Sequence, residues 1–258
     1  MRITVKVGTS TIAHPTGQLN IRHVETLCKV MSDLKNAGHE LILVSSGAIG
    51  MGMGKLSLRE RPADMPTKQA AAAVGQCELM YTYDKLFSEY NHTVGQILVT
   101  GEDLQDDTRR QNFVNTLGRL LEMHALPIIN ENDSVATQEI SVGDNDTLGA
   151  IVAVNAQADM LIVLSDIDGL YTSDPHTDPT ATLIPRVSEI NDEILSLAGV
   201  TKSTLGTGGM ATKLSAAKTC LAHGVAMFIA NGDNPDVLYD IVSGKFHGTA
   251  FIREEAAL

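Results

Sequence analysis

The sequence predicts an α/β protein with an open, mostly parallel, doubly wound sheet that is sandwiched by helices. Short runs rich in leucine and β-branched residues recur along the chain, and each run is apolar on both faces, as strands buried between helices must be. Helical patterns lie between these runs, which is typical of a parallel sheet. The expected strands are residues 3–7, 40–44, 94–99, 126–129, 160–164 and 226–230.

The segments between the strands show the periodicity of helices. Apolar residues between Ile21 and Leu34 step by three and four, and Gly38 follows as a helix stop. Residues 67–90 are rich in good helix formers, and residues 113–121 carry one apolar face on a segment that ends at His124. Another helix is expected to begin after the acidic residues 144–146.

Two segments break this alternation, at residues 50–66 and 166–185. Asp, Pro and Thr cluster in the second segment, which indicates loops or hairpins at the surface. Solvated connections are one interpretation. Lids over a site are the other, because long loops in compact domains often serve that purpose.

Length and charge limit the function. The 258 residues carry 19 Lys+Arg against 31 Asp+Glu, a formal net charge of -12. Proteins that bind a phosphate backbone concentrate Lys and Arg, so we expect no nucleic-acid partner. Because no repeat, low-complexity tract or linker interrupts the chain, a single domain over residues 1–258 is expected.

The cysteines and the lengths of the apolar runs indicate the cellular compartment of the protein. Cys28, Cys77 and Cys220 have neither the spacing of a disulfide framework nor that of a zinc site, so we expect buried thiols in a reducing compartment. The N-terminus lacks the apolar core of a signal peptide, and no run approaches 18 apolar residues. These features predict a soluble, cytoplasmic protein with no membrane partner.

Polar and glycine-rich residues follow the first two strands. Lys6-Val7-Gly8-Thr9-Ser10 places a lysine, a glycine turn and two hydroxyl groups at the carboxyl end of a strand, where ligands bind in open parallel sheets. Ser45-Ser46-Gly47-Ala48 has small residues that let a substrate approach the backbone. Taken alone, the first motif is better explained as a surface lysine beside a turn, and the second is as consistent with a purely structural Gly turn as with a binding site.

Two polar blocks are harder to explain as structure. Asn130-Glu131-Asn132-Asp133 follows a predicted strand, and Gly143-Asp144-Asn145-Asp146 opens a predicted helix. Carboxylate and amide groups at strand and helix ends suit the recognition of an ammonium group and the alignment of cations. Turn formation and helix capping easily explain one such polar block on structural grounds. They explain the presence of both blocks in one chain less easily.

The predicted strand at 160–164 leads into Ser165 and Asp166, and a glycine- and threonine-rich loop comes later in the chain. This loop ends with a lysine about one turn into a helix, which suits the neutralisation of a phosphate, although a flexible hinge is the alternative. Its spacing departs from those of the Walker A and dinucleotide motifs. The loop reads Gly206-Thr207-Gly208-Gly209-Met210-Ala211-Thr212-Lys213.

Taken in order, these blocks resemble the amino acid kinase family, and within it the glutamate 5-kinase group. Related kinases for acetylglutamate, aspartate, carbamate and uridylate share the two lysines and the Gly turns but lack the paired polar blocks in this form. The resemblance covers nearly the whole chain. It rests on residues 5–10, 45–49, 68–69, 73–76, 129–133, 142–146, 206–210 and 212–213, and on Asp168-Gly169-Leu170-Tyr171.

The resemblance implies ATP-dependent phosphorylation of the side-chain carboxylate of L-glutamate, the first step of proline synthesis. It implies that Lys6 and Lys213 flank the transferring phosphoryl group and that Asp146 holds both lysines in register. Ser46, Asp133 and Asn145 match glutamate-binding positions, with Asn130 as a helper. The nucleotide-binding positions of the family are matched by Lys6, Ser165 and Asp166 and by the loop residues Thr207, Gly208, Gly209, Met210, Ala211, Thr212 and Lys213. Mg²⁺ is expected to bridge the ATP phosphates and to be held largely by them and by water, and we assign no residue as a metal ligand.

The resemblance also implies a homodimer or homotetramer and feedback inhibition by proline. Many glutamate 5-kinases carry a C-terminal PUA domain, and we expect none here, because only seven residues follow Phe251. Two other functions stay open from the residues: another amino acid kinase, such as acetylglutamate kinase, or a non-catalytic metabolite sensor. Asp133 argues against the first because it suits a free ammonium group, and the two lysines argue against the second.

Overall fold

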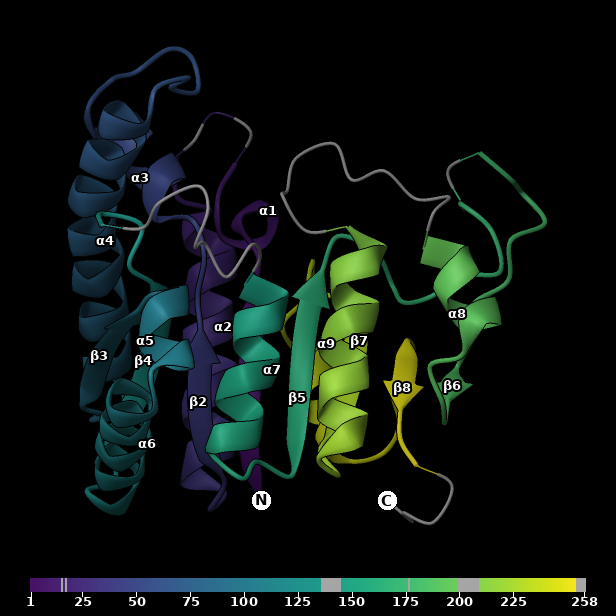
Figure 1. The fold of residues 1–258 in the computed structure, drawn as a ribbon. Coiled ribbons are helices and arrows are strands. Elements are labelled where there is room, and N and C mark those ends of the chain that lie inside the picture. The colour runs from purple at the N-terminus through teal and green to yellow at the C-terminus, as the bar shows by residue number, and fades with distance from the viewer. Residues whose placement is uncertain (15, 17, 136–144, 176, 199–208, 254–258) are drawn as a thin grey trace.

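The computed structural model describes residues 1–253 except residues 15, 17, 136–144, 176 and 199–208, and its centre is an eight-stranded sheet (Figure 1). The strand order is β3-β4-β2-β1-β5-β7-β8-β6, and the pairing is parallel everywhere except between β7 and β8. The predicted fold class is therefore confirmed. The strands are β1 (Arg2–Val7), β2 (Glu40–Val44), β3 (Val94–Val99), β4 (Leu126–Glu131), β5 (Met160–Ser165), β6 (Arg186–Val187), β7 (Ala226–Asn231) and β8 (Thr249–Phe251).

Helices cover both faces of the sheet. Side chains of α2, α4 and α10 pack with one face of β1 and β5, whereas α6, α7 and α9 pack against the opposite face, which is turned toward the viewer in Figure 1. The strands alternate their apolar side chains between these two layers, so both layers are buried. The helices are α1 (Thr9–Ile12), α2 (Ile21–Asn36), α3 (Ala48–Lys55), α4 (Met65–Ser88), α5 (Gly101–Gln105), α6 (Asp107–Glu122), α7 (Asn145–Asn155), α8 (Asp192–Leu197), α9 (Met210–Ala222) and α10 (Val237–Val242).

All six predicted strands are present, and β4 continues two residues beyond its predicted end. The predicted helices correspond to α2, α4, α6 and α7, and the helix expected to hold Lys213 corresponds to α9. Gly38 follows α2 with a φ of +94°, a conformation that glycine adopts without strain. Residues 166–185 hold no helix or named strand in their described part, in agreement with a surface connection.

The prediction of a loop over residues 50–66 is wrong for its first part, because Ala48–Lys55 forms α3. Glycine favours loops in isolation, and three glycines lie in α3. Here Gly52 of α3 and Gly75 of α4 let the two backbones approach: a Cβ atom on Gly52 would lie 1.8 Å from the Ala71 carbonyl oxygen, and one on Gly75 would lie 1.7 Å from the Ala48 carbonyl oxygen. This close packing outweighs the low helix propensity of glycine.

The prediction for the cysteines is right for Cys28 and Cys220, which are buried, and wrong for Cys77, which is exposed. No helix in the described part of the chain is both long and apolar enough to span a bilayer.

Candidate active site

The carboxyl ends of four neighbouring strands place the predicted site residues along one edge of the sheet. Asn130 comes from β4, Ser45 and Ser46 follow β2, Lys6 comes from β1, and Ser165 ends β5. The chain order of the strands reverses between β1 and β5, because β2 lies on one side of β1 and β5 on the other. Ligands of open α/β sheets bind at such a switch point.

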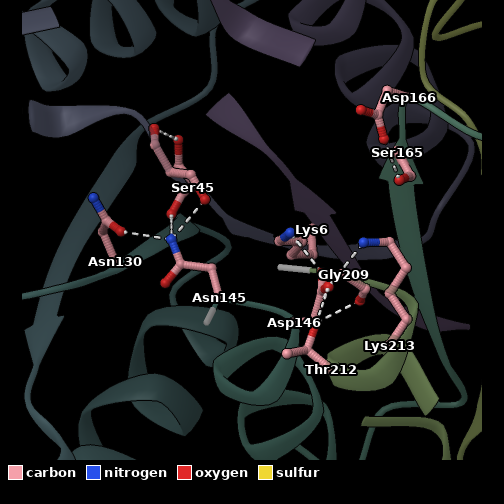
Figure 2. A network of polar contacts seen from close by, with 11 residues as sticks. Lys6, Ser45, Asn130, Asn145, Asp146, Ser165, Asp166, Gly209, Thr212 and Lys213 are labelled. Carbon is pink, nitrogen blue, oxygen red and sulfur yellow. Dashed lines mark hydrogen bonds and ion pairs between the residues drawn. The ribbon is translucent and has the colours of Figure 1, made fainter. Parts of the chain in front are cut away.

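At the centre of this edge, one carboxylate bridges two lysines (Figure 2). Asp146, in the first turn of α7, lies 2.5 Å from Lys6 Nζ through Oδ1 and 3.1 Å from Lys213 Nζ through Oδ2. The Asp146 side chain is fully buried, and those of Lys6 and Lys213 are 7% and 8% exposed. Because water screens these buried charges weakly, the Asp146 carboxylate holds both ammonium groups in place. Two ammonium groups and one carboxylate give the cluster a formal net positive charge.

An amide network lies beside the charged cluster, on the side of β2 and β4 (Figure 2). Asn145 Nδ2 donates to the Ser45 carbonyl oxygen at 2.9 Å, to Ser46 Oγ at 2.6 Å and to Asn130 Oδ1 at 3.2 Å. Asn145 and Asp146 are consecutive in α7, so the start of one helix supplies both the charged cluster and the amide network.

The start of α9 lies on the other side of the cluster. Gly209 occupies the N-cap position and has no side chain that could cap the helix, so among the described residues no side chain caps the first-turn amides, which are suited to bind an anion. Thr212 Oγ1 lies 2.7 Å from the Gly209 carbonyl oxygen and 3.3 Å from Asp146 Oδ2. The Met210 side chain is buried in the core, so only its backbone could face a ligand, whereas Ala211 is exposed. At the end of β5, Ser165 Oγ donates to Asp166 Oδ1 at 3.1 Å.

Asp133 lies in the turn after β4 and lines a cavity of about 400 Å³. The cavity lies between α3, α4 and the ends of β3 and β4, and Ala48, Gln76 and Glu131 also line it. Burial, and to a lesser extent the Glu131 carboxylate, raises the pKa of Asp133 to about 6. A carboxylate that is costly to ionise in the free protein gains from a cationic partner.

Comparison with known proteins agrees with this geometry. Residues 1–231 match the amino acid kinase family. The chain belongs to that family. Glutamate 5-kinase from Clostridium tetani is 53% identical over 249 residues, covering 96% of this chain and 93% of its own length. Glutamate 5-kinase from Clostridium acetobutylicum is 52% identical over 251 residues, covering 97% and 94%.

A solved member of the same fold is carbamate kinase from Giardia lamblia bound to AMP-PNP. It superimposes with a TM-score of 0.70 at 16% sequence identity, covering 98% of both chains. At this identity, the likeness concerns the fold alone.

The structure of this amino acid kinase family member brings together most residues that the sequence singled out. Lys6, Asp146 and Lys213 form one cluster, and Ser46, Asn130 and Asn145 form the adjoining network. Asp133 lines the cavity beyond β4, and no hydrogen bond joins it to that network among the described residues. Thr207 and Gly208, and also Gly143 and Asp144, lie outside the described residues.

Two side chains of α4 join the network without having been predicted to. Gln76 Oε1 accepts a hydrogen bond from Asn130 Nδ2 at 2.8 Å, and the Tyr83 hydroxyl group lies 2.9 Å from Ser45 Oγ. Gln76 belongs to a motif that carries the family resemblance, but its position in the middle of a helix gives no signal that it reaches a strand end. Tyr83 has the pattern of a core residue and is fully buried.

Proposed function

We propose that this protein is a glutamate 5-kinase, which transfers the γ-phosphoryl group of ATP to the side-chain carboxylate of L-glutamate and starts proline synthesis. The observation that carries the proposal is the buried Lys6–Asp146–Lys213 cluster between an amide network and the start of α9. The two relatives that are more than 50% identical over nearly the whole chain supply the name of the substrate.

The reaction needs positive charge more than it needs a base. A γ-carboxylate oxygen of glutamate attacks the γ-phosphorus atom, a new O–P bond forms, and the bond to the bridging oxygen breaks as ADP leaves with the electron pair. The attacking carboxylate is already ionised near neutral pH, so no proton has to be removed. Two anions must approach each other, and catalysis therefore comes from alignment and from charge stabilisation.

Lys6 and Lys213 are the residues that we assign to charge stabilisation. Their ammonium groups lie on opposite oxygens of one carboxylate, so a phosphoryl group in front of Asp146 would meet positive charge from two sides. Asp146 has no room to move, since its side chain is fully buried. Its role is to hold two preorganised donors, which lowers the cost of reorganisation during transfer.

The glutamate end of the site is assigned to the amide network and Asp133. Ser46, Asn145 and Asn130 provide polar groups for the α-carboxylate and the α-ammonium group. Asp133 is the carboxylate that would pair with the ammonium group, because burial raises its pKa to about 6 and a cationic partner would favour its ionised form.

The nucleotide end is assigned to Ser165, Asp166 and the segment that enters α9. Its backbone amides and Lys213 suit the phosphates of ATP. In the described part of the chain, no three acidic, His or Cys side chains form a metal-binding group, and both Asp146 oxygens face lysines. We expect a Mg²⁺ ion to enter with ATP, held largely by phosphate oxygens and water. When bound, the ion neutralises phosphate charge.

A coupled assay tests the function. Purified protein with ATP and Mg²⁺ should release ADP when L-glutamate is added, and hydroxylamine should trap the acyl phosphate as a hydroxamate. N-acetylglutamate should give neither product, because an acetylated nitrogen carries no positive charge for Asp133. Turnover of N-acetylglutamate in preference to glutamate would move the assignment to acetylglutamate kinase, and no turnover with either would leave a metabolite sensor.

A further inference from the structure

We propose that Gln76 is a positioning residue for glutamate: it accepts a hydrogen bond from Asn130 Nδ2 and so holds the Asn130 amide, and through it the Asn145 amide, in the orientation that the neighbouring backbone groups require. The inference rests on the proposed function and adds a residue to its substrate site. Gln76 is a half-buried residue near the middle of α4, 54 residues away from Asn130 in sequence. Its side-chain oxygen meets the Asn130 side chain at the end of β4.

Backbone groups decide the orientation of each amide in this network. The Glu131 N–H can only donate, so the Asn130 atom that it meets at 2.9 Å is Oδ1. The Ser45 carbonyl oxygen can only accept, so the Asn145 atom that it meets at 2.9 Å is Nδ2. Neither amide can be turned over without placing donor against donor or acceptor against acceptor.

Gln76 completes this chain of donors and acceptors. Asn130 Oδ1 accepts hydrogen bonds from the Glu131 N–H and from Asn145 Nδ2. The Asn130 Nδ2 group, at the other end of the same amide, donates to Gln76 Oε1 at 2.8 Å. Asn145 then uses its NH₂ group toward Ser45, Ser46 and Asn130, and its Oδ1 points away from them (Figure 2). An outward carbonyl oxygen is an acceptor for the N–H groups of an ammonium ion.

The packing of α4 explains why Gln76 can reach Asn130. Gly75, its neighbour, allows α4 to approach α3 so closely that a Cβ atom at position 75 would lie 2.4 Å from the Gly52 nitrogen. Gln76 also lines the cavity that Asp133 and Glu131 line. It therefore lies between the two groups of residues assigned to glutamate, Asp133 on one side and the Asn130–Asn145 pair on the other.

The Gln76→Met variant tests the proposal because it keeps the length of the side chain and removes the acceptor. We expect the glutamate KM to rise about tenfold, in keeping with one buried donor left without a partner, while the ATP KM changes less than twofold. Gln76→Glu keeps an acceptor oxygen at the same reach and should restore the glutamate KM most of the way. Gln96→Met is the matched control: Gln96 lines the same cavity from β3 and belongs to no hydrogen bond of the network described above.

A double variant separates positioning from packing. If Gln76 acts through Asn130, Gln76→Met should add nothing to the glutamate KM of Asn130→Ala, whereas independent effects would multiply. A wild-type KM in Gln76→Met, equal impairment in the Met and Glu variants, or multiplicative effects would overturn the proposal. If Gln76→Met does not fold, as judged by circular dichroism, Gln76→Ser replaces it, since the shorter side chain also loses the acceptor. Absence of glutamate turnover in the wild type would instead contradict the proposed function.

Discussion

At the scale of single residues, the site depends on charges that are removed from water and hold one another. Asp146 is the central case, because its carboxylate is the shared partner of Lys6 and Lys213 in a buried cluster. A buried ion pair adds little net stability compared with a well-packed apolar group, but removing one partner leaves the other charge without compensation. The two lysines thus depend on Asp146 for compensation of their charge, and in the proposed function they in turn stabilise the phosphoryl group.

The first prediction concerns Asp146→Asn. The change keeps the shape and removes the negative charge, so two buried ammonium groups face each other. We expect the free energy of unfolding to fall by about 3–5 kcal/mol, measured by urea denaturation. The rate kcat should fall at least as far as the roughly 10²–10³-fold typical of losing one preorganised donor, because two donors lose their anchor.

Asp107→Asn is the matched control for that experiment. Asp107 pairs with Arg110 at 2.7 Å, but its side chain is 91% exposed. Exposed pairs contribute about 1 kcal/mol or less, so this variant should unfold close to the wild type and keep its activity. Equal losses of stability in the two variants would contradict the account of a buried, mutually dependent cluster.

The second prediction concerns the pH dependence of glutamate binding. Burial raises the pKa of Asp133 to about 6, and only the ionised carboxylate can pair with an ammonium group. Lowering the pH from 7.5 to 5 should therefore weaken glutamate binding, approaching about tenfold per pH unit below 6. The α-ammonium and side-chain carboxyl groups of free glutamate stay mostly in one form over this range.

Calorimetric titration with L-glutamate alone measures this dependence, since ATP, whose phosphates titrate nearby, is left out. Asp133→Asn should bind glutamate weakly and with little change between pH 5 and 7.5. A variant that keeps the full pH dependence would show that a group other than Asp133 carries it.

At the scale of helices and strands, the sequence was informative where an element is long and buried. The parallel strands β1, β2, β4, β5 and β7 are recognisable as apolar runs because helices cover both of their faces. The strands β6 and β8, with two and three residues, are too short to show a period, and their pairing depends on the tertiary fold. The short helices α5, α8 and α10 were missed for the same reason.

The third prediction concerns the contact of α3 with α4, which local propensity did not reveal. Gly75→Ala would place a methyl group 1.7 Å from the Ala48 carbonyl oxygen, and backbone cannot move aside as a flexible side chain can. We expect a loss of about 3 kcal/mol or more in the free energy of unfolding, the upper part of the range for overpacking. Because α3 begins two residues after Ser46, glutamate binding should weaken too.

Gly118→Ala provides the comparison. Gly118 lies in the middle of α6, and a Cβ atom there would have no neighbour within 4 Å. Alanine in a helix interior gives a free energy of unfolding about 0.5–1 kcal/mol higher than glycine does. This variant should therefore be slightly more stable than the wild type in the same urea experiment. If Gly75→Ala and Gly118→Ala changed the free energy of unfolding by similar amounts, the close contact between α3 and α4 would be contradicted.

At the scale of the whole molecule, strand order brings together residues that are far apart in sequence. Lys6 and Lys213 could be predicted as anion-binding lysines, because each stands beside glycines at a strand or helix end. Which carboxylate they share was implied by the family resemblance and not by local pattern, since it depends on α7 and α9 packing on one face of the sheet. Gln76 was beyond prediction, because its contact with Asn130 joins a helix centre to a strand end.

The same arrangement leads to a fourth prediction, on proline. Proline shares with glutamate an α-carboxylate and a cationic α-nitrogen, but it has no side-chain carboxylate to phosphorylate. If it uses Asp133 and Asn145 as glutamate does, it occupies one half of the site and leaves the Lys6–Asp146–Lys213 cluster free for ATP. Inhibition should then be competitive with glutamate, and Asp133→Ala should weaken the binding of both amino acids by similar factors.

Initial rates over a grid of proline and glutamate concentrations distinguish this shared site from a separate one. In a shared site, saturating glutamate abolishes inhibition and saturating proline abolishes activity. A separate site would couple to glutamate through a finite, reciprocal free energy, so inhibition would level off below completion or persist at saturating glutamate. The Asp133→Ala variant adds an independent criterion, because a separate site would let proline binding stay unchanged while the glutamate KM rises.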